Sequence, residues 1–131
     1  MTTEMQATFR PSEERRRILI VEDEPINQKL LSRMLDRSYD VILSGNGSEA
    51  LEIIHTQHDT ISLILLDLKL PDLHGLEILR RLNADPRYAR LPVIVMTADS
   101  KAELECLSLG AIDFIPKPYP QREIVLVRIR R

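Results

Sequence analysis

The stretch LILLDLKLPDLHG, Leu63–Gly75, leads an apolar run to a single carboxylate. Leu63–Leu66 is apolar at every position and ends at Asp67, and a proline and a glycine follow. A short run without a polar side is typical of a strand that is covered on both faces, as in a parallel sheet. The stretch therefore predicts a buried strand over Ile61–Leu66 that delivers Asp67 to the edge of a sheet.

Four further runs of the same kind alternate with helical patterns along the chain. Strands are expected at Ile18–Val21, Tyr39–Leu43, Pro92–Met96 and Ala111–Ile115. The helical segments are marked by apolar residues: Ile26, Leu30, Leu31, Met34 and Leu35, then Ala50, Leu51 and Ile54, then Leu76, Leu79 and Leu82, then Leu104 and Leu107, and last Ile124 and Val127.

This alternation predicts βαβ units and therefore a parallel sheet. Because the crossovers of such units are right-handed, the helices come to cover both faces. The expected fold class is α/β: a doubly wound, five-stranded parallel sheet with helices on both faces and the flavodoxin-like strand order 2-1-3-4-5.

Local signals mark where the helices begin and end. Pro25 suits a first helical turn, where its missing N–H costs nothing. Ser100–Glu103 matches a capping box, so the fourth helix is expected to begin there and to stop at Gly110. Pro120 is expected to open the last helix, with Ile124 and Val127 facing inward.

The composition indicates one domain that works inside the cell. The 131 residues suit a single domain, and a formal charge of -2 gives no sign of binding to nucleic acid or to a membrane surface. A single cysteine, Cys106, fits a reducing cytoplasm, and no run is long enough to span a membrane. Residues 1–15 are expected to be a disordered leader and 16–131 the domain, which is expected to be the N-terminal part of a longer protein.

Polar residues follow the strands at the edge where such sheets bind ligands. Glu22 and Asp23 follow the first strand, Asp67 the third, Thr97 the fourth and Lys117 the fifth. Three carboxylates in one place repel each other, and a hard divalent cation such as Mg²⁺ removes the conflict. A carboxylate can also attack phosphorus, so the edge is predicted to support phosphoryl transfer onto Asp67.

Four stretches resemble the motifs of the response-regulator receiver domain, in order and at that family's spacing. The resemblance covers about residues 17–130, and its motifs are ILIVEDE, LILLDLKLPDLHG, PVIVMTA and GAIDFIPKP. It implies that Asp67 is the phospho-acceptor. It also implies that Thr97 hydrogen-bonds the phosphoryl group and that Lys117 forms an ion pair with it.

The resemblance further implies a metal site and a switch. Asp23, Asp67 and the backbone carbonyl of Lys69 would bind Mg²⁺, or Mn²⁺, and Glu22 would reach the ion directly or through water. Phe114 would be the switch aromatic that turns when Thr97 moves, and Lys117–Pro118 would be a cis peptide bond. The chain differs from the commoner pattern in its Glu-Asp acidic pair, in a Phe at the switch and in the cationic Lys69.

The partners implied are those of two-component signalling. A histidine kinase or a histidine phosphotransfer protein would donate the phosphoryl group. An output domain or partner would bind the face formed by the fourth helix, fifth strand and fifth helix, and a homodimer is compatible with the pattern. The output itself is open among cyclic-dinucleotide enzymes, kinases and DNA-binding domains, with a cyclic-dinucleotide enzyme preferred.

Three other functions fit the sequence less well than the receiver. A phosphatase of the haloacid-dehalogenase type would need a second aspartate where Lys69 stands. A flavodoxin would need a Ser/Thr/Gly phosphate loop where Glu22–Pro25 stands. A pseudo-receiver that serves only for binding would usually lack an acidic residue, the acceptor or the lysine, and all of these are present.

Each residue taken alone also has a simpler explanation. Asp23 or Glu24 could cap the helix at Pro25, and Thr97 could be an ordinary strand residue. Phe114 could belong to the core. Cys106 is expected to pack rather than react, and the three histidines are expected at the surface.

Overall fold

The computed structural model describes residues 15–119 and 122–130. Its centre is one parallel sheet with the order β2-β1-β3-β4-β5, which confirms the expected topology. The strands are β1 (Arg17–Val21), β2 (Asp40–Ser44), β3 (Leu63–Asp67), β4 (Val93–Thr97) and β5 (Asp113–Pro116).

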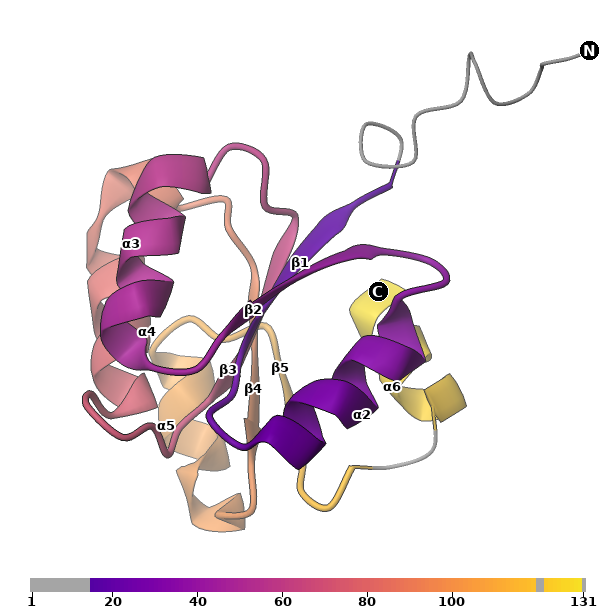
Figure 1. Ribbon diagram of the computed structural model, residues 1–131. Coiled ribbons are helices and arrows are strands. Elements are labelled where there is room, and N and C mark those ends of the chain that lie inside the picture. Colours follow the sequence, from indigo (N-terminus) through magenta and orange to yellow (C-terminus); the bar gives the residue numbers. More distant parts are fainter. Residues whose placement is uncertain (1–14, 120–121, 131) are drawn as a thin grey trace, which may run out of the picture.

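Helices cover both faces of the sheet (Figure 1). On one face lie α3 (Gly47–Gln57), α4 (Gly75–Ala84) and α5 (Glu103–Ser108). On the other lie α2 (Pro25–Leu35) and α6 (Arg122–Arg130). Short 3₁₀ turns at Pro86–Tyr88 and Ser100–Ala102 precede β4 and α5.

The core is divided by the sheet into two clusters of buried apolar side chains. Odd and even positions of a strand point to opposite faces, so Ile64 and Leu66 join one cluster while Leu63 and Leu65 join the other. The α3–α5 side is completed by helix residues that include Ala50, Ile54, Ile78, Leu79, Leu82 and Cys106. The α2–α6 side is completed by Leu31, Met34, Leu35, Val125 and Leu126. Cys106 is fully buried, which confirms its expected packing role.

Four of the five strands, β2 to β5, run one or two residues later than the sequence patterns indicated, whereas β1 ends at Val21 as expected and begins one residue earlier, at Arg17. β3 begins at Leu63 rather than Ile61, and β5 begins at Asp113 rather than Ala111. Asp67 and Thr97 are themselves the last residues of β3 and β4 and still pair in register. The predicted strands ended at the last apolar residue, whereas the backbone hydrogen bonds of β3 and β4 continue through the polar residue that follows it.

The face of α6 that packs on the sheet differs from the expected one. Ile124 and Val127 were expected to face inward, but they are 44% and 54% exposed. Val125 and Leu126 are buried instead. This expectation was wrong because four successive residues, IVLV, are apolar, so that the sequence does not mark one face. The expected helix start at Pro120 lies outside the described residues.

The start of α5 also differs from the expected capping box. The α-helix begins at Glu103, and its N-cap is Ala102, which makes no side-chain capping bond. A 3₁₀ turn fills Ser100–Ala102, and the Asp99 side chain accepts a hydrogen bond from the N–H of Lys101 at 3.0 Å. The aspartate before the expected box thus caps the turn that leads into the helix.

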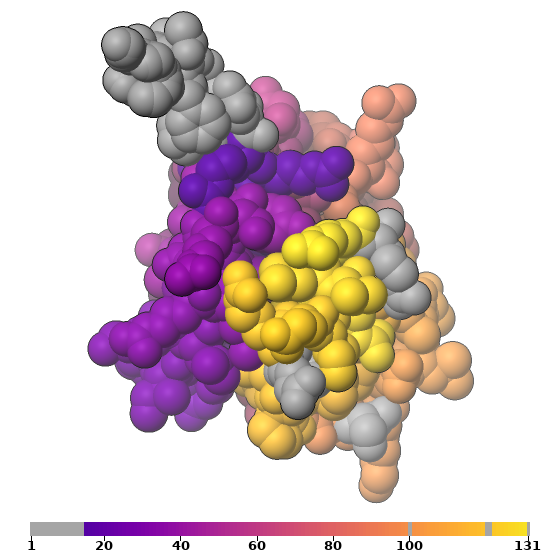
Figure 2. All heavy atoms as spheres, turned by 90° about the vertical axis from the view of Figure 1, so that its right-hand side faces the viewer, coloured from indigo at the N-terminus to yellow at the C-terminus, as the bar shows by residue number. Residues whose placement is uncertain are grey.

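Helices α2 and α6 lie side by side on their face of the sheet, as Figure 2 shows in purple and yellow. The Arg122 guanidinium in α6 donates to the carbonyl of Met34 in α2 at 3.0 Å. No helix within residues 15–119 and 122–130 is long and apolar enough to cross a membrane.

Candidate functional site

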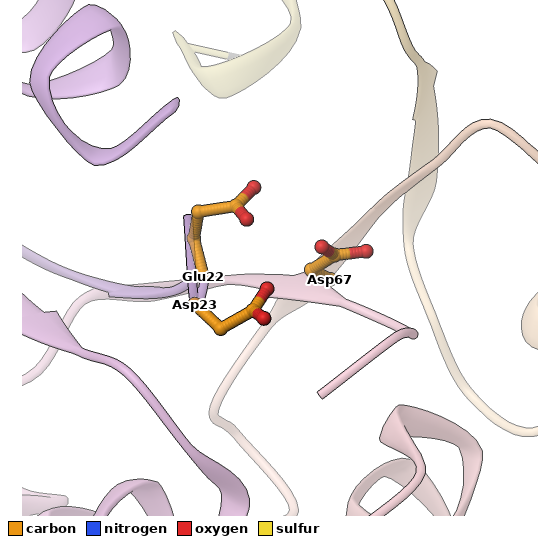
Figure 3. A group of neighbouring side chains, drawn as sticks. All are labelled: Glu22, Asp23 and Asp67. Carbon is orange, nitrogen blue, oxygen red and sulfur yellow. The ribbon is translucent and has the colours of Figure 1, made fainter. Parts of the chain in front are cut away.

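The carboxyl edge of the sheet brings three carboxylates together. Glu22 and Asp23 follow β1, and Asp67 ends the neighbouring strand β3, so the parallel register places them side by side. Each offers an oxygen, and these oxygens lie within 4.8 Å of one another. Figure 3 shows Glu22 and Asp23 extending toward Asp67 from the adjacent strand. Glu22 and Asp67 are buried and Asp23 is exposed, so the group opens to solvent on one side.

Lys117 joins two of these carboxylates. Its Nζ lies 2.7 Å from Oδ2 of Asp67 and 2.9 Å from Oε1 of Glu22. The N–H of Lys117 donates to the carbonyl of Thr97 at 3.0 Å, which anchors the segment to the end of β4. The Lys117–Pro118 peptide bond is cis, as expected.

The two buried carboxyls respond differently to their surroundings. Burial raises the pKa of Asp67, and the hydrogen bond from Lys117 only partly opposes this. Burial acts in the same direction at Glu22, but donors from Lys117, the Glu24 N–H and Tyr119 outweigh it and lower the pKa of Glu22. The pKa of Lys117 is raised, because its bonds to Asp67 and Glu22 outweigh its own burial. Lys117 therefore stays charged at neutral pH.

Thr97 lies at the same edge, one strand beyond Asp67. It is buried, and its Oγ1 accepts a hydrogen bond from the N–H of Asp99 at 3.2 Å. A hollow of about 290 Å³ opens at this point. It is lined by Asp23, Glu24, Asp67, Lys69, Thr97, Ala98 and Lys117. The hollow is large enough for a phosphoryl group and leaves it in contact with solvent.

The loop after β3 is held close to the end of that strand. The N–H of Gly75 donates to the carbonyl of Leu68 at 2.8 Å, and the N–H of Lys69 donates to Oδ1 of Asp67 at 3.3 Å. A Cβ at position 75 would lie 2.6 Å from the carbonyl oxygen of Asp67. Gly75, at the end of the stretch Leu63–Gly75, is therefore required by close contact with the backbone of Asp67.

Asp72 ties the same loop to a second helix. Its two carboxylate oxygens accept from the N–H groups of Gly47 and Ser48, at 2.7 and 2.9 Å, at the N-terminus of α3. These bonds lower the pKa of Asp72 to about 2. The stretch Leu63–Gly75 thus positions Asp67, and its Asp72 also fixes the loop after β3 to α3.

Tyr119 is a site residue that sequence reasoning missed. Its hydroxyl donates to Oε1 of Glu22 at 2.9 Å, and Lys117 Nζ lies 5.8 Å from the centre of its ring. Burial and the negative charge of Glu22 raise the pKa of Tyr119. Only its position two residues after Lys117 could have drawn attention to it.

The other residues singled out from the sequence lie around this centre. Phe114 is 6% exposed and packs in the core on the α3–α5 side. Glu24 is the N-cap residue of α2 but makes no side-chain capping bond. His74 is the N-cap of α4, where its Nδ1 accepts from the N–H of Leu76 at 3.1 Å. Lys69 and Asp99 are exposed and line a second hollow beside the first.

The donor set fits a hard divalent cation. Carboxylate and carbonyl oxygens are the ligands that Mg²⁺ prefers, and the ion usually keeps several waters. Two carboxylates from β1 and one from β3 supply such oxygens, with the exposed Asp23 on the open side. Beside them, Asp67 is a carboxylate that can act as a nucleophile toward phosphorus.

Comparison with known proteins identifies one family. The model of the response regulator receiver domain matches residues 18–128 of the chain. A protein named as a two-component response regulator in Arabidopsis thaliana is 37% identical over 111 residues, which cover 84% of this chain and 18% of that protein. A protein of Vibrio cholerae named as a cyclic di-GMP phosphodiesterase is 38% identical over 103 residues, which cover 77% of this chain and 23% of the relative. The chain therefore spans less than a quarter of the length of these two relatives.

A solved structure agrees with the fold. The receiver domain of the sensor histidine kinase PA1611 from Pseudomonas aeruginosa is 33% identical, with a TM-score of 0.76, and the match covers 88% of this chain and 96% of that one. That structure is described as having a magnesium ion coordinated in its active site cleft.

Proposed function

This chain belongs to the response regulator receiver domain family, and on that premise we propose that it accepts a phosphoryl group on Asp67. The observation that carries the proposal is the position of Asp67. It is buried at the end of β3, with Lys117 at 2.7 Å and two further acidic residues, Glu22 and Asp23, beside it. An aspartate with a purely structural role would not need an ammonium and two further carboxylates beside it.

In the proposed reaction an oxygen of Asp67 attacks phosphorus in a phosphohistidine. The P–N bond breaks as the new P–O bond forms, and the imidazole leaves with the electron pair and takes a proton from solvent. Lys117 pairs with the phosphoryl oxygens, and the Thr97 hydroxyl donates a hydrogen bond to one of them. These groups orient the phosphoryl group and offset its charge, which is what phosphoryl transfer requires of a protein.

The acidic residues are proposed to hold Mg²⁺, with Mn²⁺ as an alternative. Asp23, Asp67 and the backbone carbonyl of Lys69 would bind the ion, and Glu22 would reach it directly or through water. Bound Mg²⁺ would offset the negative charge that the carboxylates and the phosphoryl oxygens share. The magnesium described for the related receiver structure supports this proposal.

The signal is proposed to pass through Thr97 and Phe114 to the face formed by α5, β5 and α6. Thr97 would move toward the phosphoryl group, and Phe114 would turn to fill the space it leaves. Apolar side chains exposed on this face support partner binding there. They are Leu104, Leu107, Ile112, Ile124 and Val127.

The partners proposed are those of two-component signalling. A histidine kinase or a histidine phosphotransfer protein would supply the phosphoryl group, and the same face would serve an output domain or a homodimer. Residues 16–131 would form the receiver, while residues 1–14 of the expected leader lie outside the described part of the chain, and Arg15 donates a hydrogen bond to the carbonyl of Tyr39 at 2.8 Å. The relative named as a cyclic di-GMP phosphodiesterase supports a cyclic-dinucleotide output beyond the receiver. The free thiol of Cys106 suits the cytoplasm.

The proposal is tested by phosphorylation with acetyl phosphate and Mg²⁺. Wild type should gain the mass of one phosphoryl group by intact-mass spectrometry, and Asp67→Asn should gain none. Equal labelling of both proteins would show that Asp67 is not the acceptor. No labelling of wild type by acetyl phosphate or by a phosphorylated histidine phosphotransfer domain would favour a receiver that serves only for binding.

A further inference from the structure

Tyr119 contacts two of the charged groups at the phosphorylation site. Its hydroxyl donates to Oε1 of Glu22 at 2.9 Å, and its ring lies beside the ammonium of Lys117. The ring is half-buried against the core cluster on the α2–α6 side, which holds the hydroxyl in place. Tyr119 therefore links the segment after β5 to the end of β1.

Three donors reach the two oxygens of the Glu22 carboxylate. Oε1 accepts from Lys117 at 2.9 Å and from Tyr119 at 2.9 Å. Oε2 accepts from the N–H of Glu24 at 3.1 Å. Glu22 is 0% exposed, so water cannot readily replace a donor that is lost. A buried carboxylate deprived of a donor is costly.

Lys117 is shared between Glu22 and Asp67, and phosphorylation would compete for it. When a phosphoryl group is attached to Asp67, its oxygens would draw the ammonium away from Oε1 of Glu22. Without another donor, Oε1 would then be buried and unpaired. The Tyr119 hydroxyl already bonds this oxygen and does not depend on Lys117.

We propose that Tyr119 is a positioning residue of this site, whose hydroxyl holds Glu22 so that Lys117 is free to move to the phosphoryl group. This inference rests on the proposed function. A second consequence concerns the cation. The hydroxyl points its positive hydrogen at the carboxylate, so it lowers the negative potential that attracts a cation. Removing it should strengthen cation binding while it slows phosphoryl transfer.

The test compares Tyr119→Phe with a matched control, Tyr39→Phe. Both changes remove one hydroxyl, and both rings pack against the same core cluster. At saturating Mg²⁺, Tyr119→Phe should take phosphoryl from acetyl phosphate about tenfold more slowly than wild type, the effect of a change of about 1.4 kcal/mol in the barrier. With no donor present, an NMR titration should show Mg²⁺ binding several-fold more tightly to Tyr119→Phe. Tyr39→Phe should match wild type in both measurements.

The opposite directions separate positioning from loss of structure, because a loosened site would both bind Mg²⁺ more weakly and react more slowly. In a Glu22→Gln background, Tyr119→Phe should no longer change Mg²⁺ affinity, since the carboxylate it acts on is gone. An unchanged or weaker Mg²⁺ affinity in Tyr119→Phe, or a wild-type rate of uptake, would overturn the proposal. If wild type takes up no phosphoryl group, the proposed function fails, and the Mg²⁺ titration alone decides whether Tyr119 acts through Glu22.

Discussion

Glu22 and Asp67 are buried carboxylates that both contact the ammonium of Lys117. They differ in the other hydrogen bonds that each one accepts. Glu22 has donors from Lys117, Tyr119 and the Glu24 N–H. Asp67 has Lys117 and a longer bond from the Lys69 N–H at 3.3 Å. We expect the weaker support to make Asp67 more reactive than Glu22. Asp67 also ends a strand and lines the open hollow.

At the residue scale, Lys69 and Asp99 are expected to set how long the phosphoryl group lasts. Both are exposed and line the hollow beside Thr97, where water would approach opposite the Asp67 oxygen. No ion pair joins them in the part of the chain that the structure describes, so each should act separately. Lys69→Ala and Asp99→Ala should each change the rate of dephosphorylation severalfold and leave uptake nearly intact. Phosphate release from the phosphorylated single and double mutants measures this. Rates that all stay within about twofold of wild type, a barrier change of about 0.4 kcal/mol, would contradict it.

At the element scale, the acceptor loop and α3 form one unit through Asp72. The carboxylate accepts the N–H groups of Gly47 and Ser48, which would otherwise lack partners at a helix start. Asn46 caps the same turn, because its side chain accepts from the N–H of Glu49 at 2.8 Å. Two side chains, one local and one from the loop after β3, thus satisfy the first turn of α3.

Stability in acid should report on this contact. The pKa of Asp72 falls from 3.8 to about 2 on folding, so its contribution is fully present above pH 3.8 and is lost as the pH falls through about 2. Asp72→Asn should be less stable than wild type at pH 6, and the difference should shrink between these two pH values. Urea unfolding across this range measures it. Asp59→Asn, which removes an exposed carboxylate without a hydrogen bond or ion pair in the described structure, is the control. A difference that stays constant down to pH 2 would contradict the role of Asp72.

At the scale of the whole molecule, the site should cost the fold some stability. Burial disfavours the charge of Asp67, and Lys117 would keep Glu22 as a partner if Asp67 were removed. Without metal, Asp67→Ala is therefore expected to unfold at the same temperature as wild type or higher, as functional sites often trade stability for activity.

With Mg²⁺ present, wild type should unfold at a higher temperature than Asp67→Ala, because a cation that binds only the folded state stabilises it by mass action. Wild type should gain in melting temperature with Mg²⁺, and Asp67→Ala and Asp23→Ala should gain less. Thermal melts with and without Mg²⁺ measure both effects. A clear loss of stability in metal-free Asp67→Ala would assign Asp67 a structural role, and a full Mg²⁺ shift in Asp23→Ala would remove it as a ligand.

The sequence by itself determined the fold class and the chemistry of the edge. Apolar runs that end at polar residues place those residues at the carboxyl ends of strands, and a parallel sheet brings all these ends to one edge. For this reason the sequence alone predicts which polar residues lie at this edge: Glu22, Asp23, Asp67, Thr97 and Lys117. The alternation of strands and helices is a local pattern, and such patterns can be recognised in a single sequence.

The tertiary structure alone decided which groups touch across long separations. Tyr119 and Glu22 are 97 residues apart, and Asp72 reaches Gly47 over 25, so no periodicity in the chain marks either contact. The face of α6 was likewise fixed by packing, because an apolar run such as IVLV fits the core on more than one side. Strand ends shifted because neighbouring strands extend the ladder past the last apolar residue. In each case the outcome depends on the energy of contacts between elements, and these contacts exist only after the chain has folded.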